Sequence, residues 1–147
     1  MKKLTYTIKI NKPVEFVFGK MTDKEAYPGW AKAWGEGMAY EGEWKEGGHI
    51  SFFDTSGQGT KVVVEEIVPN VSIKMKHVAM IEEGNKEVKG LDETMQKWIG
   101  SQEDYFFNAL SGDETELKIV IEADEAFEEM MQAWPKALEY LKEICEA

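Results

Sequence analysis

The hydrophobic positions near the N-terminus alternate with polar ones. Leu4, Tyr6, Ile8 and Ile10 are apolar, and the residues between them are threonine or lysine. A period of two is typical of a strand that buries one face. We therefore predict a strand that ends at about residue 10.

Two short helices are expected after this strand. The segment Asn11-Lys12-Pro13 indicates a helix start, because proline is tolerated in the first helical turn. The first helix has an apolar side made of Val14, Val17, Phe18 and Met21. Asp23 is placed to cap the second helix, and Tyr27-Pro28-Gly29 is expected to end it.

A series of strand patterns follows, each bounded by turn residues. They cover residues 38–43, 49–55, 61–68, 71–80, 104–110 and 115–122. Short connections between such segments favour antiparallel hairpins. The polar segment 82–101 is poorly periodic and contains a short helix or strand at about 94–98. It is either a functional lid or a plain surface excursion.

The C-terminal segment has the clearest helical pattern. Apolar residues recur there at helical spacing: Phe127, Met130, Met131, Trp134, Leu138, Leu141, Ile144 and Cys145. Asp124 is a suitable N-cap, and Pro135 removes one backbone hydrogen bond and should bend the helix. We predict one kinked helix from about 125 to 146.

These elements predict an α+β fold. A curved antiparallel sheet that grips the long kinked C-terminal helix is the economical way to bury both apolar faces. The two short helices follow strand 1. With no internal repeat and no linker in the sequence, we expect residues 1–147 to form a single domain.

Charge and cysteine content limit the kinds of binding partner and the cellular compartment to be expected. The net charge is −11, and all 17 basic residues are lysines. Repulsion from phosphates argues against nucleic acid and anionic membranes as partners, and no apolar run is long enough for membrane insertion. The single Cys145 excludes an internal disulfide and fits a reducing, cytoplasmic location.

Several short stretches carry a family resemblance when their order and spacing are taken together. They are 10–13, 44–48 with 50–52, 64–69, 98–103 with Tyr105, 115–117, and 134–138 with 141–142. With them, the chain resembles the START-like, helix-grip superfamily (SRPBCC), which includes birch pollen allergen proteins and polyketide cyclases. Within it, the sequence is similar to the branch named after the activator of the heat-shock-protein-90 ATPase, specifically its C-terminal domain.

The resemblance covers nearly the whole chain and implies a deep cavity between the sheet and the C-terminal helix. Across the superfamily such cavities hold lipids, polyketides, hormones and other hydrophobic molecules. The name of the branch implies chaperone stimulation, but the eukaryotic activator uses an additional N-terminal domain that this sequence does not contain. Function must therefore be argued from the site.

Aromatic and methionine side chains are the candidate ligand contacts, because they combine apolar bulk with adaptable shape. With two titratable groups, His77 and Glu103, the predicted ligand-binding set is Trp30, Trp34, Phe52, Met75, His77, Glu103, Tyr105, Phe107, Met130, Met131 and Trp134. The plain alternative is that the apolar members only pack the core. His77 is expected on one strand face with Val71, Ile73 and Met75.

Three functions follow, in this order. The first is binding of a hydrophobic or amphipathic small molecule. The second is a cyclase-like or hydrolase-like enzyme that uses His77, Glu103 or Tyr105, and it requires at least two of them to converge on one point of the cavity. The third is a chaperone-associated interaction domain.

The other expectations concern metals, cofactors and assembly. We assign no catalytic residue and predict no cofactor. We also predict no metal site, because two isolated histidines and one cysteine form no metal-binding pattern. A homodimer is a further option if Trp44 or Trp98 is exposed. A buried turn position explains either tryptophan equally well.

Overall fold

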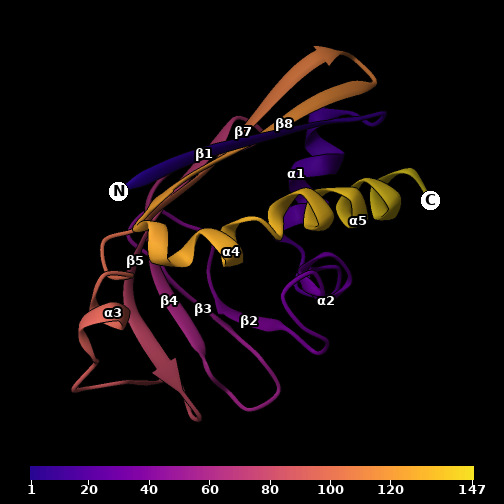
Figure 1. Cartoon of the computed structure of the whole chain (residues 1–147). Helices are drawn as coiled ribbons and strands as arrows, with labels where there is room; N and C mark the ends of the chain where they lie inside the picture. Colours follow the sequence, from indigo (N-terminus) through magenta and orange to yellow (C-terminus); the bar gives the residue numbers. More distant parts are fainter.

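The computed structural model describes all 147 residues and has the predicted α+β architecture (Figure 1). The elements are β1 (Lys2–Ile10), α1 (Val14–Thr22), α2 (Tyr27–Ala31), β2 (Ala39–Gly42), β3 (His49–Phe53), β4 (Gly59–Val68), β5 (Ser72–Glu82), β6 (Lys86–Glu87), α3 (Glu93–Gln96), β7 (Gln102–Ser111), β8 (Glu114–Ala123), the 3₁₀ turn η1 (Glu125–Phe127), α4 (Glu128–Met131) and α5 (Trp134–Glu146). The predicted strand–helix–helix start and the predicted succession of strands are confirmed.

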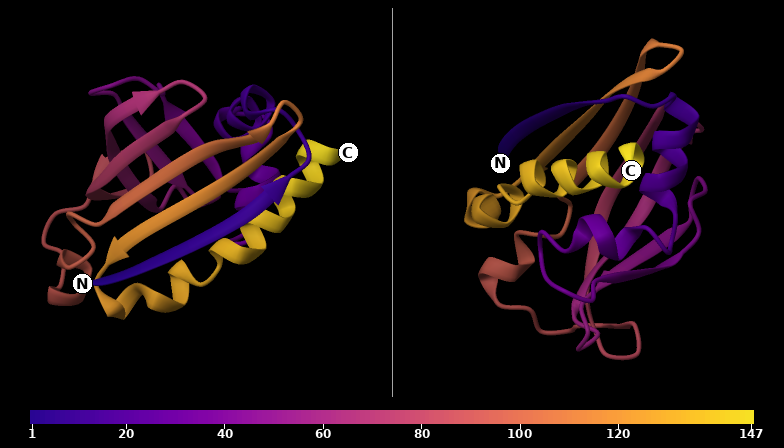
Figure 2. Two further views of the ribbon diagram at one scale, coloured as in Figure 1. Left: turned by 90° about the horizontal axis from the view of Figure 1, so that it is seen from above. Right: turned by 90° about the vertical axis from the view of Figure 1, so that its right-hand side faces the viewer.

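The strands form one antiparallel sheet in the order β1-β8-β7-β5-β4-β3-β2, with β6 added beside β5. One face of the sheet is buried and the other is not. On β8, for example, every second residue from Thr115 to Ala123 is buried while its neighbours are not. The sheet curves around the C-terminal helix, which lies along its concave side, and α1 and α2 lie near that helix (Figure 2). No helix is both long enough and apolar enough to cross a membrane.

The C-terminal helical segment is confirmed, but it is interrupted where a bend was expected. Asp124 caps it as predicted, since its carboxylate accepts a hydrogen bond of 3.0 Å from the Ala126 N–H. The helix breaks at Gln132 and Ala133, and Pro135 lies in the first turn of α5. A proline there leaves no hydrogen bond missing, so restarting the helix satisfies the backbone better than bending through the ring.

The second short helix differs from the prediction. Tyr27-Pro28-Gly29 was expected to end a helix, whereas α2 begins at Tyr27 with Pro28 in its first turn. Proline is preorganised for a helix start, and this preference prevailed over its role as a terminator. The shift places Trp30 on a helix, where the side chain is buried against the core.

The polar segment 82–101 contains a minimal strand and one helical turn. β6 extends the sheet edge beside β5, and α3 is capped by Asp92, whose carboxylate accepts a hydrogen bond of 2.7 Å from the Met95 N–H. Trp98 then turns inward and is buried. The segment is therefore anchored to the core at Trp98.

We expect Gly59→Ala to destabilise the protein by about 1–3 kcal/mol, the usual cost of overpacking. A Cβ at Gly59 would lie 1.8 Å from the Phe52 carbonyl oxygen of the neighbouring strand. Gly19→Ala is the matched control, because nothing lies within 4 Å of its Cβ position in α1. That variant should gain about 0.5–1 kcal/mol from helix propensity. Urea unfolding of both variants tests the pair, and equal effects would contradict the packing at Gly59.

Candidate functional site

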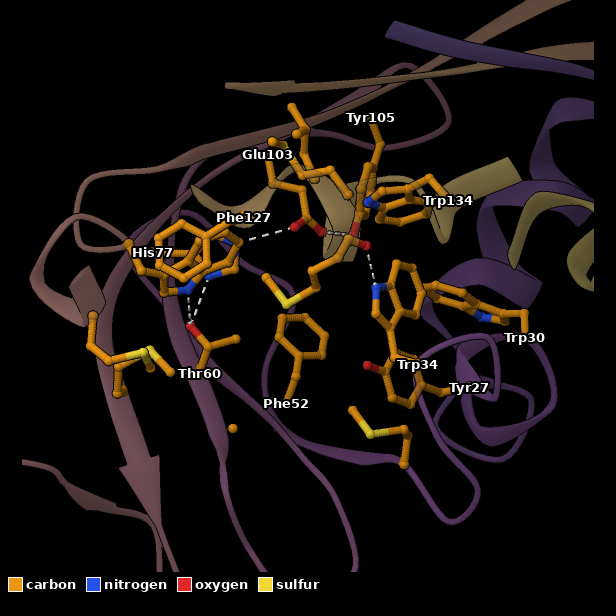
Figure 3. Close-up of a pocket in the computed structure, with 18 residues that line it drawn as sticks. Tyr27, Trp30, Trp34, Phe52, Thr60, His77, Glu103, Tyr105, Phe127 and Trp134 are labelled. Carbon is orange, nitrogen blue, oxygen red and sulfur yellow. Dashed lines mark hydrogen bonds and ion pairs between the residues drawn. The ribbon is translucent and has the colours of Figure 1, made fainter. Parts of the chain in front are cut away.

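A cavity of about 240 Å³ lies between the sheet and the C-terminal helical segment and is partly open to solvent (Figure 3). Fourteen of its 18 lining residues are hydrophobic. Its walls come from the α2 region, β3, β4, β5, α3, β7, β8 and the chain from 127 to 134. The cavity that the family resemblance implies is therefore present in this chain.

Aromatic rings form one end of the cavity. Trp134 at the start of α5 packs between Trp30, at a ring-centroid distance of 5.9 Å, and Trp34, at 4.9 Å. The Tyr105 ring lies 5.6 Å from Trp134, and the Tyr27 ring lies 4.9 Å from Trp30. Such edge-to-face and stacked pairs stabilise one another beyond their area burial.

A chain of hydrogen bonds crosses the other end of the cavity. The Trp98 indole N–H donates to the Thr60 hydroxyl over 3.0 Å, and that hydroxyl lies 2.8 Å from His77 Nδ1. His77 Nε2 lies 3.1 Å from one Glu103 oxygen, and the Tyr105 hydroxyl donates to the other (Figure 3). The structure thus brings His77, Glu103 and Tyr105 together.

Strand register explains why these side chains meet. Glu103 and Tyr105 alternate onto the same face of β7, and Glu103 lies opposite Met75 on β5. His77 is two residues further along β5, so it is the diagonal neighbour of Glu103. Near this point β5 has one residue more than β4, because Lys61 pairs with Ala79 but Val62 pairs with His77. Irregular pairing of this kind redirects side chains, and bulges are common beside functional sites.

The hydrogen-bond geometry identifies several of the donors in this chain of side chains. The Thr60 hydroxyl accepts from the Trp98 indole N–H, and it also lies 2.8 Å from His77 Nδ1 and 3.3 Å from the Ala79 carbonyl oxygen. His77 Nε2 lies 3.1 Å from the Glu103 carboxylate and donates its proton to it. Burial and the neighbouring Glu103 carboxylate raise the pKa of Tyr105 well above 10, which keeps it a donor.

Buried tyrosines predict a loss of stability at alkaline pH. Burial raises the pKa of both Tyr27 and Tyr105 above 10, the ordinary value for the unfolded chain. The contribution of these two tyrosines to the free energy of unfolding is intact below pH 10. It is lost as the pH rises above 10, because the unfolded state then releases protons more readily than the folded state. In a titration followed by tyrosinate absorbance, these two groups should ionise only together with loss of the circular-dichroism signal. Their ionisation in the folded protein would contradict the burial.

Nine of the eleven predicted ligand-binding residues line the cavity. They are Trp30, Trp34, Phe52, His77, Glu103, Tyr105, Met130, Met131 and Trp134. Met75 and Phe107 are buried in the core but do not line the cavity, so core packing is the role the structure gives them. Val71 does not share the buried face of His77, because it precedes β5 and is 53% exposed.

Nine lining residues were not among the predicted set: Tyr27, Met38, Gly59, Thr60, Met80, Met95, Trp98, Ile121 and Phe127. Thr60 is the most informative of them, since its contact with His77 depends on the irregular pairing of β4 with β5. Trp98 had a usable signal, because it is the one large aromatic residue in the polar segment. Of the two proposed dimer residues, Trp98 is buried, as in the alternative of a buried position, and Trp44 is half-buried.

The rim of the cavity is formed by Trp34, Phe127 and Met130. The Trp34 indole N–H donates to the Met130 carbonyl over 3.0 Å, which ties the chain after α2 to α4. The same three residues also line a shallow recess on the outside of the molecule. They therefore separate the cavity from that outer surface, and Met130 is 41% exposed.

Comparison with solved structures finds the same fold in several bacterial proteins. The solution structure of the Aha1 dimer from Colwellia psychrerythraea has a TM-score of 0.71 and 17% identity, over 99% of this chain and 97% of that chain. A crystal structure from Mesorhizobium loti has a TM-score of 0.76 and 13% identity over the same shares. One from Chromobacterium violaceum has 0.69 and 18%, again over 99% and 97%. At these identities the likeness extends to the fold.

Sequence comparison places the chain in a family. No curated protein matches it significantly. The family described as "Activator of Hsp90 ATPase homolog 1-like protein" matches residues 11–146, which is nearly the entire chain and includes every residue that lines the cavity. The chain therefore belongs to this family, within the START-like superfamily that its motifs resemble.

Proposed function

We propose that the chain binds a small, largely apolar molecule in the cavity between the sheet and the C-terminal helical segment. The observation that carries this proposal is the cavity wall itself, which is mostly aromatic and methionine and contains one short polar chain. Ligand sites typically combine an apolar lining with a few fixed polar groups. The volume of about 240 Å³ corresponds to a ligand of modest size.

The cost of an empty cavity supports the same proposal. Cavities left by core truncation cost about 24 cal/mol per Å³, so a dry and sealed cavity of this size would cost roughly 6 kcal/mol. That is comparable to the whole stability of a typical domain, about 5–15 kcal/mol. An opening to solvent relieves part of this cost by admitting water, and an apolar ligand would relieve it further by displacing that water.

Binding of a neutral aromatic probe tests the proposal. Toluene should bind with a measurable shift in tryptophan fluorescence, because four of the five tryptophans line the cavity. Ile121→Phe, which places a larger side chain on the β8 wall, should weaken binding at least fivefold. Leu110→Phe is the matched control, since Leu110 is exposed on the distant β7–β8 hairpin. If the unaltered protein binds neither toluene nor a polar derivative of the same ring, the proposal is overturned.

A second candidate function is proton-transfer catalysis on a bound molecule, favoured by the convergence of His77, Glu103 and Tyr105. The requirement that at least two of these groups meet at one point is satisfied. We rank it below binding because both His77 ring nitrogens are engaged by protein atoms, and a general base needs a free acceptor near its substrate. An activity abolished by His77→Gln, with ligand affinity retained, would reverse this ranking.

A further inference from the structure

The Glu103 carboxylate retains free hydrogen-bond-accepting capacity at the cavity. An ionised carboxylate offers about four acceptor positions. Here two donors use it, His77 Nε2 and the Tyr105 hydroxyl. The Glu103 side chain keeps 11% of its surface exposed, against 3% for His77. A ligand that donates a hydrogen bond therefore finds its acceptor at Glu103.

The Glu103 carboxylate has no lysine or arginine partner in the cavity. The lining residues include no lysine, and arginine is absent from the sequence. His77 is the one basic side chain beside it, with Nε2 3.1 Å from the carboxylate. A buried charge without a counter-charge is costly. An ammonium group on the ligand would place a permanent positive charge beside the carboxylate, whereas a carboxylate or phosphate on the ligand would be repelled.

The aromatic wall favours the same kind of ligand. Eight of the lining residues are aromatic: Tyr27, Trp30, Trp34, Phe52, Trp98, Tyr105, Phe127 and Trp134. The face of an aromatic ring carries negative potential and attracts organic cations, and tryptophan does so best. Tyr105 and the cluster around Trp134 adjoin Glu103, so the carboxylate and the rings act on one region of the cavity (Figure 3).

We propose that the cavity recognises a small apolar amine in its protonated form, with the ammonium group at Glu103 and the apolar part among the aromatic and methionine side chains. This inference rests on the proposed binding function and specifies its ligand class. The cavity volume equals that of about eight water molecules at roughly 30 Å³ each, which suits an amine with one ring or a short branched chain.

Four probes of one skeleton test the charge preference: toluene, benzyl alcohol, benzylamine and benzoate. Their dissociation constants can be measured at pH 7 by tryptophan fluorescence and by ligand-observed NMR. We expect benzylamine to bind at least tenfold more tightly than toluene or benzyl alcohol, and benzoate to bind most weakly. Glu103→Gln keeps the shape and removes the charge, so it should lower the benzylamine-to-toluene affinity ratio about 10- to 100-fold, the range for charge-assisted hydrogen bonds.

Glu66→Gln is the matched control for that variant. Glu66 lies on β4, where its side chain is 51% exposed and pairs with Lys74, so the affinity ratio should not change. Toluene binding to Glu103→Gln shows in the same experiment that the variant is folded. If toluene or benzyl alcohol binds the unaltered protein as tightly as benzylamine, the amine inference is overturned and the binding function stands. If none of the four probes binds, the binding function itself is overturned.

Discussion

Trp134→Ala is expected to lower the free energy of unfolding by about 3–5 kcal/mol, the usual cost of removing a buried tryptophan. The Trp134 side chain is 2% exposed and contacts the rings of Trp30, Trp34 and Tyr105. It also begins α5, so its loss loosens the junction between the helix and the cavity wall. Urea denaturation monitored by circular dichroism measures the change.

Tyr140→Ala is the matched control on the same helix. Tyr140 is only partly buried, and its ring contacts the ammonium groups of Lys32 and Lys136 at the surface. Its removal should therefore cost clearly less than the loss of Trp134, since less apolar area returns to water. Similar losses in the two variants would mean that α5 depends on helix propensity alone and that the Trp134 cluster adds little.

The fold could be predicted from the sequence because its signals are local. Alternation in β1 and β8 and the helical spacing from Phe127 to Cys145 each follow from burying one face of an element. The exact starts of two helices were harder to predict, because proline can either begin or interrupt a helix. Pro28 and Pro135 both lie in the first turn of a helix, where the ring fits. Pro28 had been expected to end a helix, whereas the bend expected near Pro135 is present as the break at Gln132 and Ala133.

The candidate site could be predicted only in part. Large aromatic residues and His77 stand out in the sequence, and strand alternation places Glu103 beside Tyr105. The contact between His77 and Thr60, in contrast, depends on the irregular pairing of β4 with β5, which has no local signature. Cys145 illustrates the simpler case of a buried thiol, whose pKa burial raises to about 11, so it is a poor nucleophile at neutral pH.

Removing the Glu103 carboxylate is also expected to lower the free energy of unfolding strongly. In Glu103→Leu, the His77 Nε2–H and the Tyr105 hydroxyl both lose their acceptor inside the protein. Each orphaned buried donor costs about 1–3 kcal/mol, so the expected loss of unfolding free energy is about 2–6 kcal/mol. Urea denaturation at pH 7 measures it, and Glu66→Leu on the exposed face of β4 provides the comparison.

The double variant Glu103→Leu/Tyr105→Phe separates orphaned donors from lost packing. Tyr105→Phe alone should cost about 1 kcal/mol, because it removes one hydrogen bond and leaves a charged acceptor that His77 still satisfies. When Tyr105→Phe is added to Glu103→Leu, it should instead restore about 1–3 kcal/mol of unfolding free energy. The reason is that the donor left without an acceptor is then gone. Such a change of sign identifies the carboxylate as the acceptor that organises this end of the cavity. Simple additivity of the two losses would show that Glu103 and Tyr105 act independently, and the hydrogen-bonded chain would then not be a unit.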